Sequence, residues 1–177
     1  MSGHNKWSKI KNKKAATDAQ KSRIFGKLVR FVAVESKKAK GDVNSPGLRA
    51  AIEKAKEANV PSDNIERAVK KGQGGESGEM EQIIYEAYGP GGCALMIEAL
   101  TENRNKAAQE IKHILSENGF ELATPGSAIW AFEKQIGSGW LPKNTISISE
   151  KDGEKLNTLI EELEENDEIQ EVFTNAE

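Results

Sequence analysis

The sequence has little of what disulfide-bonded, zinc-binding or membrane-spanning proteins need. It contains one cysteine, Cys93, and two histidines in 177 residues. One cysteine excludes an internal disulfide, and with two histidines it falls short of the four ligands of a usual structural zinc site. No apolar run reaches the ~18 residues that would cross a bilayer, and residues 1–30 lack the apolar core of a signal peptide. We therefore expect a cytoplasmic protein with no cofactor and no membrane partner.

The formal net charge of −3 at pH 7 hides a strong asymmetry along the chain. Residues 1–78 contain 18 Lys+Arg and 8 Asp+Glu, whereas residues 79–177 contain 7 and 20, so the two parts carry +10 and −13. Clustered cations release counterions from a phosphate backbone, and the asymmetry therefore indicates a nucleic-acid-facing region. The alternative is that lysine-rich helices are merely solvated. It fits residues 1–40 poorly, because twelve basic residues there stand against two acidic ones.

Residues 1–78 predict a small basic domain of three helices. The first runs from Asp18 to about Lys40, with Ile24, Phe25, Leu28, Val29 and Val32 in one apolar stripe. Its two successors offer apolar faces that can cover it: Leu48, Ile52, Ala55, Ile65, Ala68 and Val69.

Capping residues mark where the second and third helices begin. Ser45 precedes Pro46, an arrangement typical of an N-cap followed by a proline at the first helical position. Pro61 ends the second helix, and Ser62 or Asp63 is expected to cap the third.

After a glycine-rich linker the periodicity changes to two, which predicts strands. Two strands flank the turn at residues 89–92, and a helix follows that Gly119 ends. Residues 120–135 predict a strand pair and residues 144–149 a short strand. Ser149 and Asp152 form a capping box before a further helix, and a last strand ends the chain. The order β-β-α-β-β-β-α-β predicts an acidic α+β domain over residues 79–177, ferredoxin-like, with helices on one face of a sheet.

No stretch of the sequence combines an acid, a base and a nucleophile. The turn "GPGG" leads into Cys93 and a strand rather than into a helix, so a hairpin fits better than a phosphate loop. No histidine lies at a spacing from Cys93 that would make it the base for a cysteine nucleophile, so Cys93 is better explained as a small buried residue. The glutamates of residues 161–165 flank the apolar stripe formed by Leu159, Ile160 and Leu163 and fit the solvated face of that helix. We therefore expect a protein that is not an enzyme.

The start of the chain combines cations with an aromatic residue. Trp7 lies between Lys6 and Lys9, where its ring either stacks on an exposed base or folds back onto the helices. No helix with base-reading side chains is evident, so phosphate contacts are expected rather than sequence-specific readout. The candidate nucleic-acid-binding residues here are Lys6, Trp7, Lys9, Lys11, Lys13, Lys14, Lys21, Arg23, Lys27 and Arg30.

Five stretches, in consistent order, carry a resemblance over nearly the whole chain: "SGHNKWSKIKNKKAATDAQKSRIFGKL", "LRAAIEKAKEANVPSDNIERAVKKG", "YEAYGPGG", "LTENRN" and "EVFTNAE". They resemble the YebC/PmpR family, whose mitochondrial relatives are translational activators of cytochrome c oxidase. The resemblance implies a cytosolic, non-enzymatic protein with a helical N-terminal domain, and adds Arg104 of the intact "ENRNK" segment as a binding candidate. Members usually insert a third domain where this chain has only residues 136–139. A naturally short form and an engineered deletion both fit.

Three functions remain open. The first two are what the resemblance implies, and the third comes from the charge asymmetry alone. The first is a probable transcriptional regulatory protein that binds DNA through its basic domain. The second is a ribosome-associated translation factor that binds ribosomal RNA and relieves stalling at proline-rich stretches. The third is a protein-interaction module, in which the acidic domain binds a partner and the basic part only solubilises.

Overall fold

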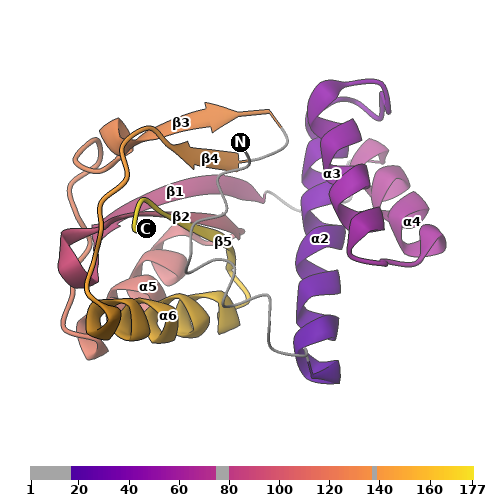
Figure 1. Ribbon diagram of the computed structural model, residues 1–177. Coiled ribbons are helices and arrows are strands. Elements are labelled where there is room, and N and C mark those ends of the chain that lie inside the picture. Colours follow the sequence, from indigo (N-terminus) through magenta and orange to yellow (C-terminus); the bar gives the residue numbers. More distant parts are fainter. Residues whose placement is uncertain (1–16, 75–79, 137–138) are drawn as a thin grey trace. The chain divides into compact units, whose positions relative to one another are not determined.

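The computed structural model describes residues 17–74, 80–136 and 139–177 (Figure 1). They form two compact units, which we call the helical unit (α2, α3 and α4) and the α+β unit (all strands, with α5 and α6). The predicted boundary between residues 78 and 79 falls outside the described residues and stays a prediction. Within the described ranges, no helix is both long and apolar enough to cross a membrane.

The helical unit consists of α2 (Asp18–Lys38), α3 (Pro46–Glu57) and α4 (Ser62–Gln73). Ser45 is the N-cap of α3 as predicted, with Pro46 at the first helical position. The predicted cap of α4 is wrong. Pro61, in an extended conformation, is the N-cap, because its carbonyl accepts the first helical bonds from the N–H groups of Asn64 (2.9 Å) and Ile65 (3.2 Å).

The core of the helical unit follows the predicted faces. Leu28 and Val32 of α2 pack with Leu48, Ala55, Ile65 and Ala68 from the other two helices, and Phe25, Val29, Ile52 and Val69 are partly buried around them. Ile24 departs from the prediction, because it is 45% exposed. It lies at the edge of the stripe, since four residues turn the helix by slightly more than a full turn and carry Ile24 away from the centre of the buried face.

The last turns of α2 and α4 approach closely because one glycine permits it. A Cβ atom added at Gly72 would lie 2.5 Å from Ser36 Cβ and 2.6 Å from the Ala33 carbonyl oxygen. The hydroxyl of Ser36 donates a hydrogen bond of 2.7 Å to the Val69 carbonyl across the same contact. Gly72 therefore fixes the distance between the two helices.

The α+β unit confirms the predicted class. A three-stranded sheet has the order β1 (Glu81–Tyr88), β2 (Ala94–Thr101), β5 (Ile169–Thr174), and β3 (Phe132–Gln135) pairs with β4 (Gly139–Pro142). The helices are α5 (Arg104–Glu117) and α6 (Glu150–Glu165). Strands β2 and β5 are antiparallel, with Leu95 opposite Thr174 and Ile97 opposite Val172.

Strand β2 is the centre of this unit and faces two cores. Leu95 and Ile97 join Ile111 and Leu115 of α5 and Leu156, Leu159 and Leu163 of α6, so both helices cover one face of the sheet (Figure 1). Ala94 and Met96 point to the other face and pack with Ala131 and Phe132 at the start of β3. The alternation of side chains along one strand produces both layers, which is why every residue of β2 is buried.

Two predicted strands are not formed as expected. Residues 144–149 contain only one bridge, between Ile146 and Ala176, and residues 120–131 contain one, between Leu122 and Ala87. Ile146 and Ile148 alternate because they pack against the core rather than because they pair in a ladder. The sequence reasoning also missed β4.

Candidate nucleic-acid interface

The structure describes five of the predicted binding residues. Lys21, Arg23, Lys27 and Arg30 belong to α2, and Arg104 opens α5. The other six predictions lie outside the described residues: Lys6, Trp7, Lys9, Lys11, Lys13 and Lys14.

Helix α2 does not gather its four cations on one side. A capping box at Thr17 starts the helix, with the Gln20 side chain accepting a 2.8 Å bond from the Thr17 N–H. At 3.6 residues per turn, Arg23, Lys27 and Arg30 share one side and Lys21 lies on another. Lys21 is exposed and the two arginines are half-buried, whereas Lys27 is only 9% exposed. Lys27 is thus the least accessible of the four to a phosphate.

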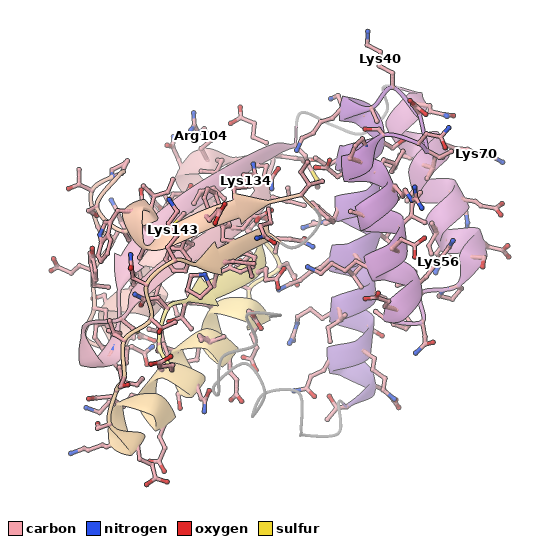
Figure 2. The ribbon with its side chains drawn as sticks, turned by 45° about the horizontal axis from the view of Figure 1, so that its top comes forward. Lys40, Lys56, Lys70, Arg104, Lys134 and Lys143 are labelled. Atoms are coloured by element: carbon pink, nitrogen blue, oxygen red, sulfur yellow. The ribbon has the colours of Figure 1, made fainter. Side chains whose placement is uncertain are left out.

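Arg104 stands at an exposed position in the first turn of α5 (Figure 2). The Thr101 hydroxyl accepts a 2.9 Å bond from the Asn103 N–H, and Asn103 caps α5 by accepting a 3.1 Å bond from the Lys106 N–H. The Tyr85 hydroxyl donates a 3.2 Å bond to the Arg104 carbonyl. The "TENRN" stretch therefore sets the start of α5 and with it the backbone position of Arg104.

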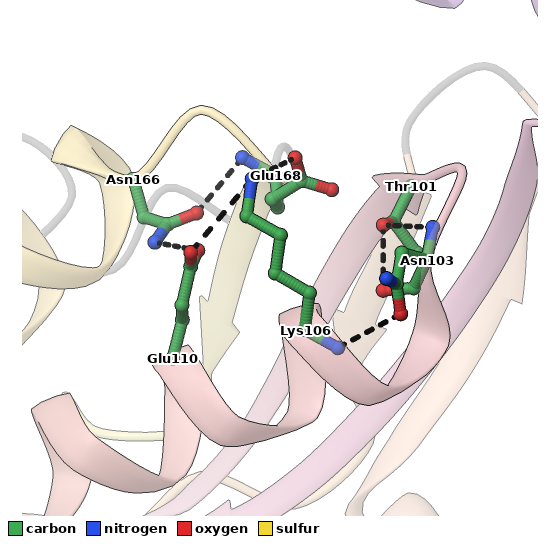
Figure 3. Close-up of polar contacts among 6 residues, drawn as sticks. All are labelled: Thr101, Asn103, Lys106, Glu110, Asn166 and Glu168. Atoms are coloured by element: carbon green, nitrogen blue, oxygen red, sulfur yellow. Dashed lines mark hydrogen bonds and ion pairs between the residues drawn. The ribbon is translucent and has the colours of Figure 1, made fainter.

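The neighbouring charges of α5 are tied to the loop before β5 (Figure 3). The Lys106 ammonium lies 3.4 Å from a Glu168 oxygen and 3.8 Å from Glu110, and the Asn166 amide donates a 2.7 Å bond to Glu110. Lys106 is thereby occupied by two carboxylates. This network explains the position of Lys106 structurally and makes it a poor phosphate ligand.

A buried carboxylate that the sequence reasoning missed holds the loop before β3. Glu86 of β1 is 7% exposed and accepts backbone N–H bonds from Gly126, Ala128 (2.9 Å) and Ile129 (2.7 Å). These bonds compensate for burying the charge. A single acidic residue in a strand pattern gives no sign of this role, because its donors come from some forty residues further along the chain.

The same loop presents an exposed aromatic side chain. Trp130 is 55% exposed, and its Nε1–H donates a 3.0 Å bond to the Tyr88 hydroxyl, which itself donates to the Ser127 carbonyl. Ile129 beside it is 40% exposed. The acidic α+β unit thus has an apolar surface of its own, at a place that the sequence reasoning did not identify.

Cys93 lies in the core, as predicted. It is fully buried beside Leu95 and Leu156, and this burial raises the pKa of its thiol above the ordinary value of 9.0. A protonated, inaccessible thiol is a poor nucleophile. In the described part of the chain, no three Cys, His, Asp or Glu side chains gather as a metal site.

The fold and the surface define an α+β protein that carries a separate helical unit with exposed cations. Comparison with known proteins extends this to a family. The model described as TACO1/YebC protein N-terminal domain matches residues 5–75, and the one described as TACO1/YebC second and third domain matches residues 80–138 and 134–176. The chain belongs to the TACO1/YebC family, which confirms the resemblance found in the sequence.

Relatives and a solved structure support the assignment. A "probable transcriptional regulatory protein" of Fervidobacterium nodosum is 41% identical, covering 99% of this chain and 93% of the relative. One of Petrotoga mobilis is 44% identical, covering 100% of this chain and 71% of the relative. The crystal structure of a conserved hypothetical protein from Aquifex aeolicus matches with a TM-score of 0.81 and 31% identity, covering 97% of this chain and 96% of that one.

The comparisons also bear on the short connection at residues 136–139. The match to the Fervidobacterium protein runs over 235 positions, whereas this chain has 177 residues, so the relative contains a long stretch without a counterpart here. The match to the second and third domains consists of two pieces that meet at residues 134–138, between β3 and β4. The absence of an inserted domain in this chain stays a prediction.

Proposed function

We propose that the protein is a nucleic-acid-binding regulator of gene expression whose helical unit contacts DNA. The charge of that unit carries the proposal: residues 17–74 contain 13 Lys+Arg and 7 Asp+Glu, although the whole chain is acidic. The relatives named probable transcriptional regulatory proteins support it. The same names favour a binding protein over an enzyme, and a regulator of transcription acts in the cytoplasm of a bacterial cell.

Phosphate contacts are the mechanism that these residues support. Lys21, Arg23 and Arg30 offer cations along α2, and the arginines can each grip two phosphate oxygens. Binding of this kind positions a protein on a backbone without reading bases, and it weakens steeply as salt rises. If six to ten cations contact phosphates, the affinity falls by roughly 10³ or more between low and moderate salt.

Ribosomal RNA is the competing target. Contacts with phosphates alone suit folded RNA as well as DNA, and on the ribosome the protein would act in translation through proline-rich stretches. Crosslinking in cells, followed by sequencing of the attached nucleic acid, separates the two. Reads concentrated at promoters support DNA, whereas reads concentrated in ribosomal RNA contradict it and support the translation factor.

A second candidate function rests on the apolar surface of the acidic unit. Ile129 and Trp130 are exposed side by side on a loop that the Glu86 carboxylate holds in place. An exposed tryptophan on a firmly held loop suits a protein partner. Replacing Trp130 by Ala would abolish such an interaction and leave nucleic-acid binding unchanged.

The direct test reverses charges on α2 and at the start of the chain. One variant changes Lys21, Arg23 and Arg30 to Glu, and another changes Lys9, Lys11, Lys13 and Lys14 to Glu. The matched control changes three exposed lysines of the α+β unit to Glu: Lys112, Lys151 and Lys155. Mobility shifts with duplex DNA at physiological salt should be lost in the first two and kept in the control. Retained binding in both basic variants would refute the proposal.

A further inference from the structure

Five lysines lie at the shared C-terminal ends of α2 and α4, away from the predicted binding residues. Lys37 and Lys38 are in the last turn of α2, and Lys70 and Lys71 are in the last turn of α4. Lys40 lies two positions after the end of α2, past the C-cap Ala39, and all five residues are exposed. Figure 2 labels Lys40 and Lys70, whose side chains project outward from this end of the helical unit. We call the five residues the lysine end.

Two hydrogen bonds bring these segments together in space, although they are about thirty residues apart in the sequence. The Ser36 hydroxyl bonds to the Val69 carbonyl at 2.7 Å, and the Gln73 amide donates a 3.4 Å bond to the Gly41 carbonyl. Gly72 lies between Val69 and Gln73 along α4, and its close approach is to Ala33 and Ser36 of α2. The two helix ends are therefore held side by side, and their lysines form one surface.

Two acidic side chains lie in the same stretch as the lysines of α2. The acidic residues of the same stretch are Glu35 and Asp42. A Glu35 oxygen lies 2.8 Å from the Lys38 ammonium, and Asp42 accepts a 2.9 Å bond from the Asn44 N–H. Glu35 thus pairs with Lys38, and the formal count at this end is five lysines and two carboxylates. The test below therefore uses Lys40, Lys70 and Lys71.

A purely structural explanation covers only part of the lysine end. Cations in the last turn of a helix stabilise its dipole, which accounts for the four lysines inside α2 and α4. Lys40 is different, because its backbone has φ = 52° in the left-handed region. Such positions after a helix favour Gly or Asn, and Asn59 fills the corresponding position after α3 with φ = 62°. A lysine at this position costs stability relative to glycine, so stability alone does not explain it.

We propose that the lysine end binds the phosphate backbone of a nucleic acid. It forms a second contact surface at the far end of α2 from Lys21 and Arg23. Sixteen residues separate Lys21 from Lys37, which corresponds to about 24 Å along the helix. This inference rests on the proposed function and adds that the helical unit contacts one nucleic acid at two separate places. A duplex of about seven base pairs spans the distance between them.

The salt dependence of binding tests the proposal. A triple variant changes Lys40, Lys70 and Lys71 to Gln, and a control triple changes Lys112, Lys151 and Lys155 to Gln, which removes the same charge from the other unit. Binding of the full chain to duplex DNA, single-stranded DNA and duplex RNA is measured by fluorescence anisotropy across a salt series. Loss of three phosphate contacts lowers the slope of log K against log salt by about 2.7 for duplex DNA and about 2.1 for single strands. The control should keep the wild-type slope.

The variant Lys40→Gly separates binding from stability. It removes one cation and relieves the left-handed backbone strain, so its melting temperature should equal or exceed that of the wild type while its affinity falls. An affinity that does not fall would show that Lys40 makes no contact. A series of duplexes of increasing length should show the lysine-end variants losing affinity only on duplexes longer than about seven base pairs.

The outcomes distinguish this proposal from the proposed function. If the wild-type chain binds none of the three probes, the proposed function fails and the lysine end with it. If the wild type binds and the lysine-end triple keeps the same slope, the lysine end is not a contact surface, and the proposed function stands. If the control triple loses as much affinity as the lysine-end triple, the effect comes from net charge, and the lysine end is not a contact surface. The three probes show which nucleic acid supplies the phosphates.

Discussion

The two units of this protein use charge in opposite ways. Most cations of the helical unit lie at exposed or half-buried positions around a small core rich in alanine, although Lys27 is nearly buried. The close approach of α2 and α4 depends on Gly72. The α+β unit buries a carboxylate, Glu86, and satisfies it with backbone donors from the loop before β3. The comparison shows that most charges of the basic unit face solvent, whereas one carboxylate of the acidic unit is buried and stabilises its fold.

The substitution with the largest expected effect on stability, Leu95→Ala, tests whether the two units unfold independently. Leu95→Ala removes a fully buried side chain from the centre of β2 and should cost about 3–5 kcal/mol. Hydrogen exchange should accelerate in α5, α6 and β5 and remain unchanged in α2, α3 and α4. Equal acceleration in both units would show that they unfold together. Ile24→Ala, at an exposed position, serves as the control with little change.

A smaller effect is expected from Gly72→Ala in the helical unit. The new methyl group would meet the Ala33 carbonyl at 2.6 Å, so α2 and α4 must move apart at a cost of about 1–3 kcal/mol. Thermal unfolding should show a lower melting temperature. Gly74→Ala is the matched control, because its nearest atom lies 3.7 Å away in ordinary contact. A similar loss in both variants would contradict the close-approach argument.

Glu86→Gln should have a comparable or smaller effect, confined to the α+β unit. The amide cannot accept all three backbone bonds, and at least one buried N–H loses its partner at about 1–3 kcal/mol. Amide exchange at Gly126, Ala128 and Ile129 should accelerate first. The exposed Glu133 provides the control, since Glu133→Gln should leave these amides protected.

The smallest effect concerns the Cys93 thiol and appears only at high pH. Burial raises its pKa in the folded state above the ordinary value of 9.0. The unfolded chain therefore loses this proton first as the pH rises, and stability falls above pH 9.0 by up to about 1.4 kcal/mol per pH unit until the folded-state pKa is reached. Denaturant titrations from pH 7 to pH 10 should show this slope in the wild type, and Cys93→Ala should lack it. Identical pH dependence of the two would refute the assignment.

Local patterns explain why much of the fold was predictable. The apolar stripes of α2 and α6, the cap at Ser149 and the turn at residues 89–92 arise from contacts between residues near in sequence. The prediction failed where distant residues decide the local structure. Residues 144–149 alternate like a strand but are held by packing against the core. The prediction for α4 failed for a local reason, because Pro61 rather than Ser62 or Asp63 is its N-cap. The same limit applies to the site, since Trp130 owes its position to Glu86 and Tyr88.

The sequence by itself determined the charge asymmetry, the α+β class and the family, because composition, periodicity and motif order can be read along a single chain. The tertiary structure alone decided that Lys27 is nearly inaccessible, that Glu86 is satisfied by a distant loop, and that five lysines from two helix ends share one surface. The physical reason is that accessibility and charge clustering depend on which segments pack together. In the helical unit, a glycine and one hydrogen bond between α2 and α4 settle that packing.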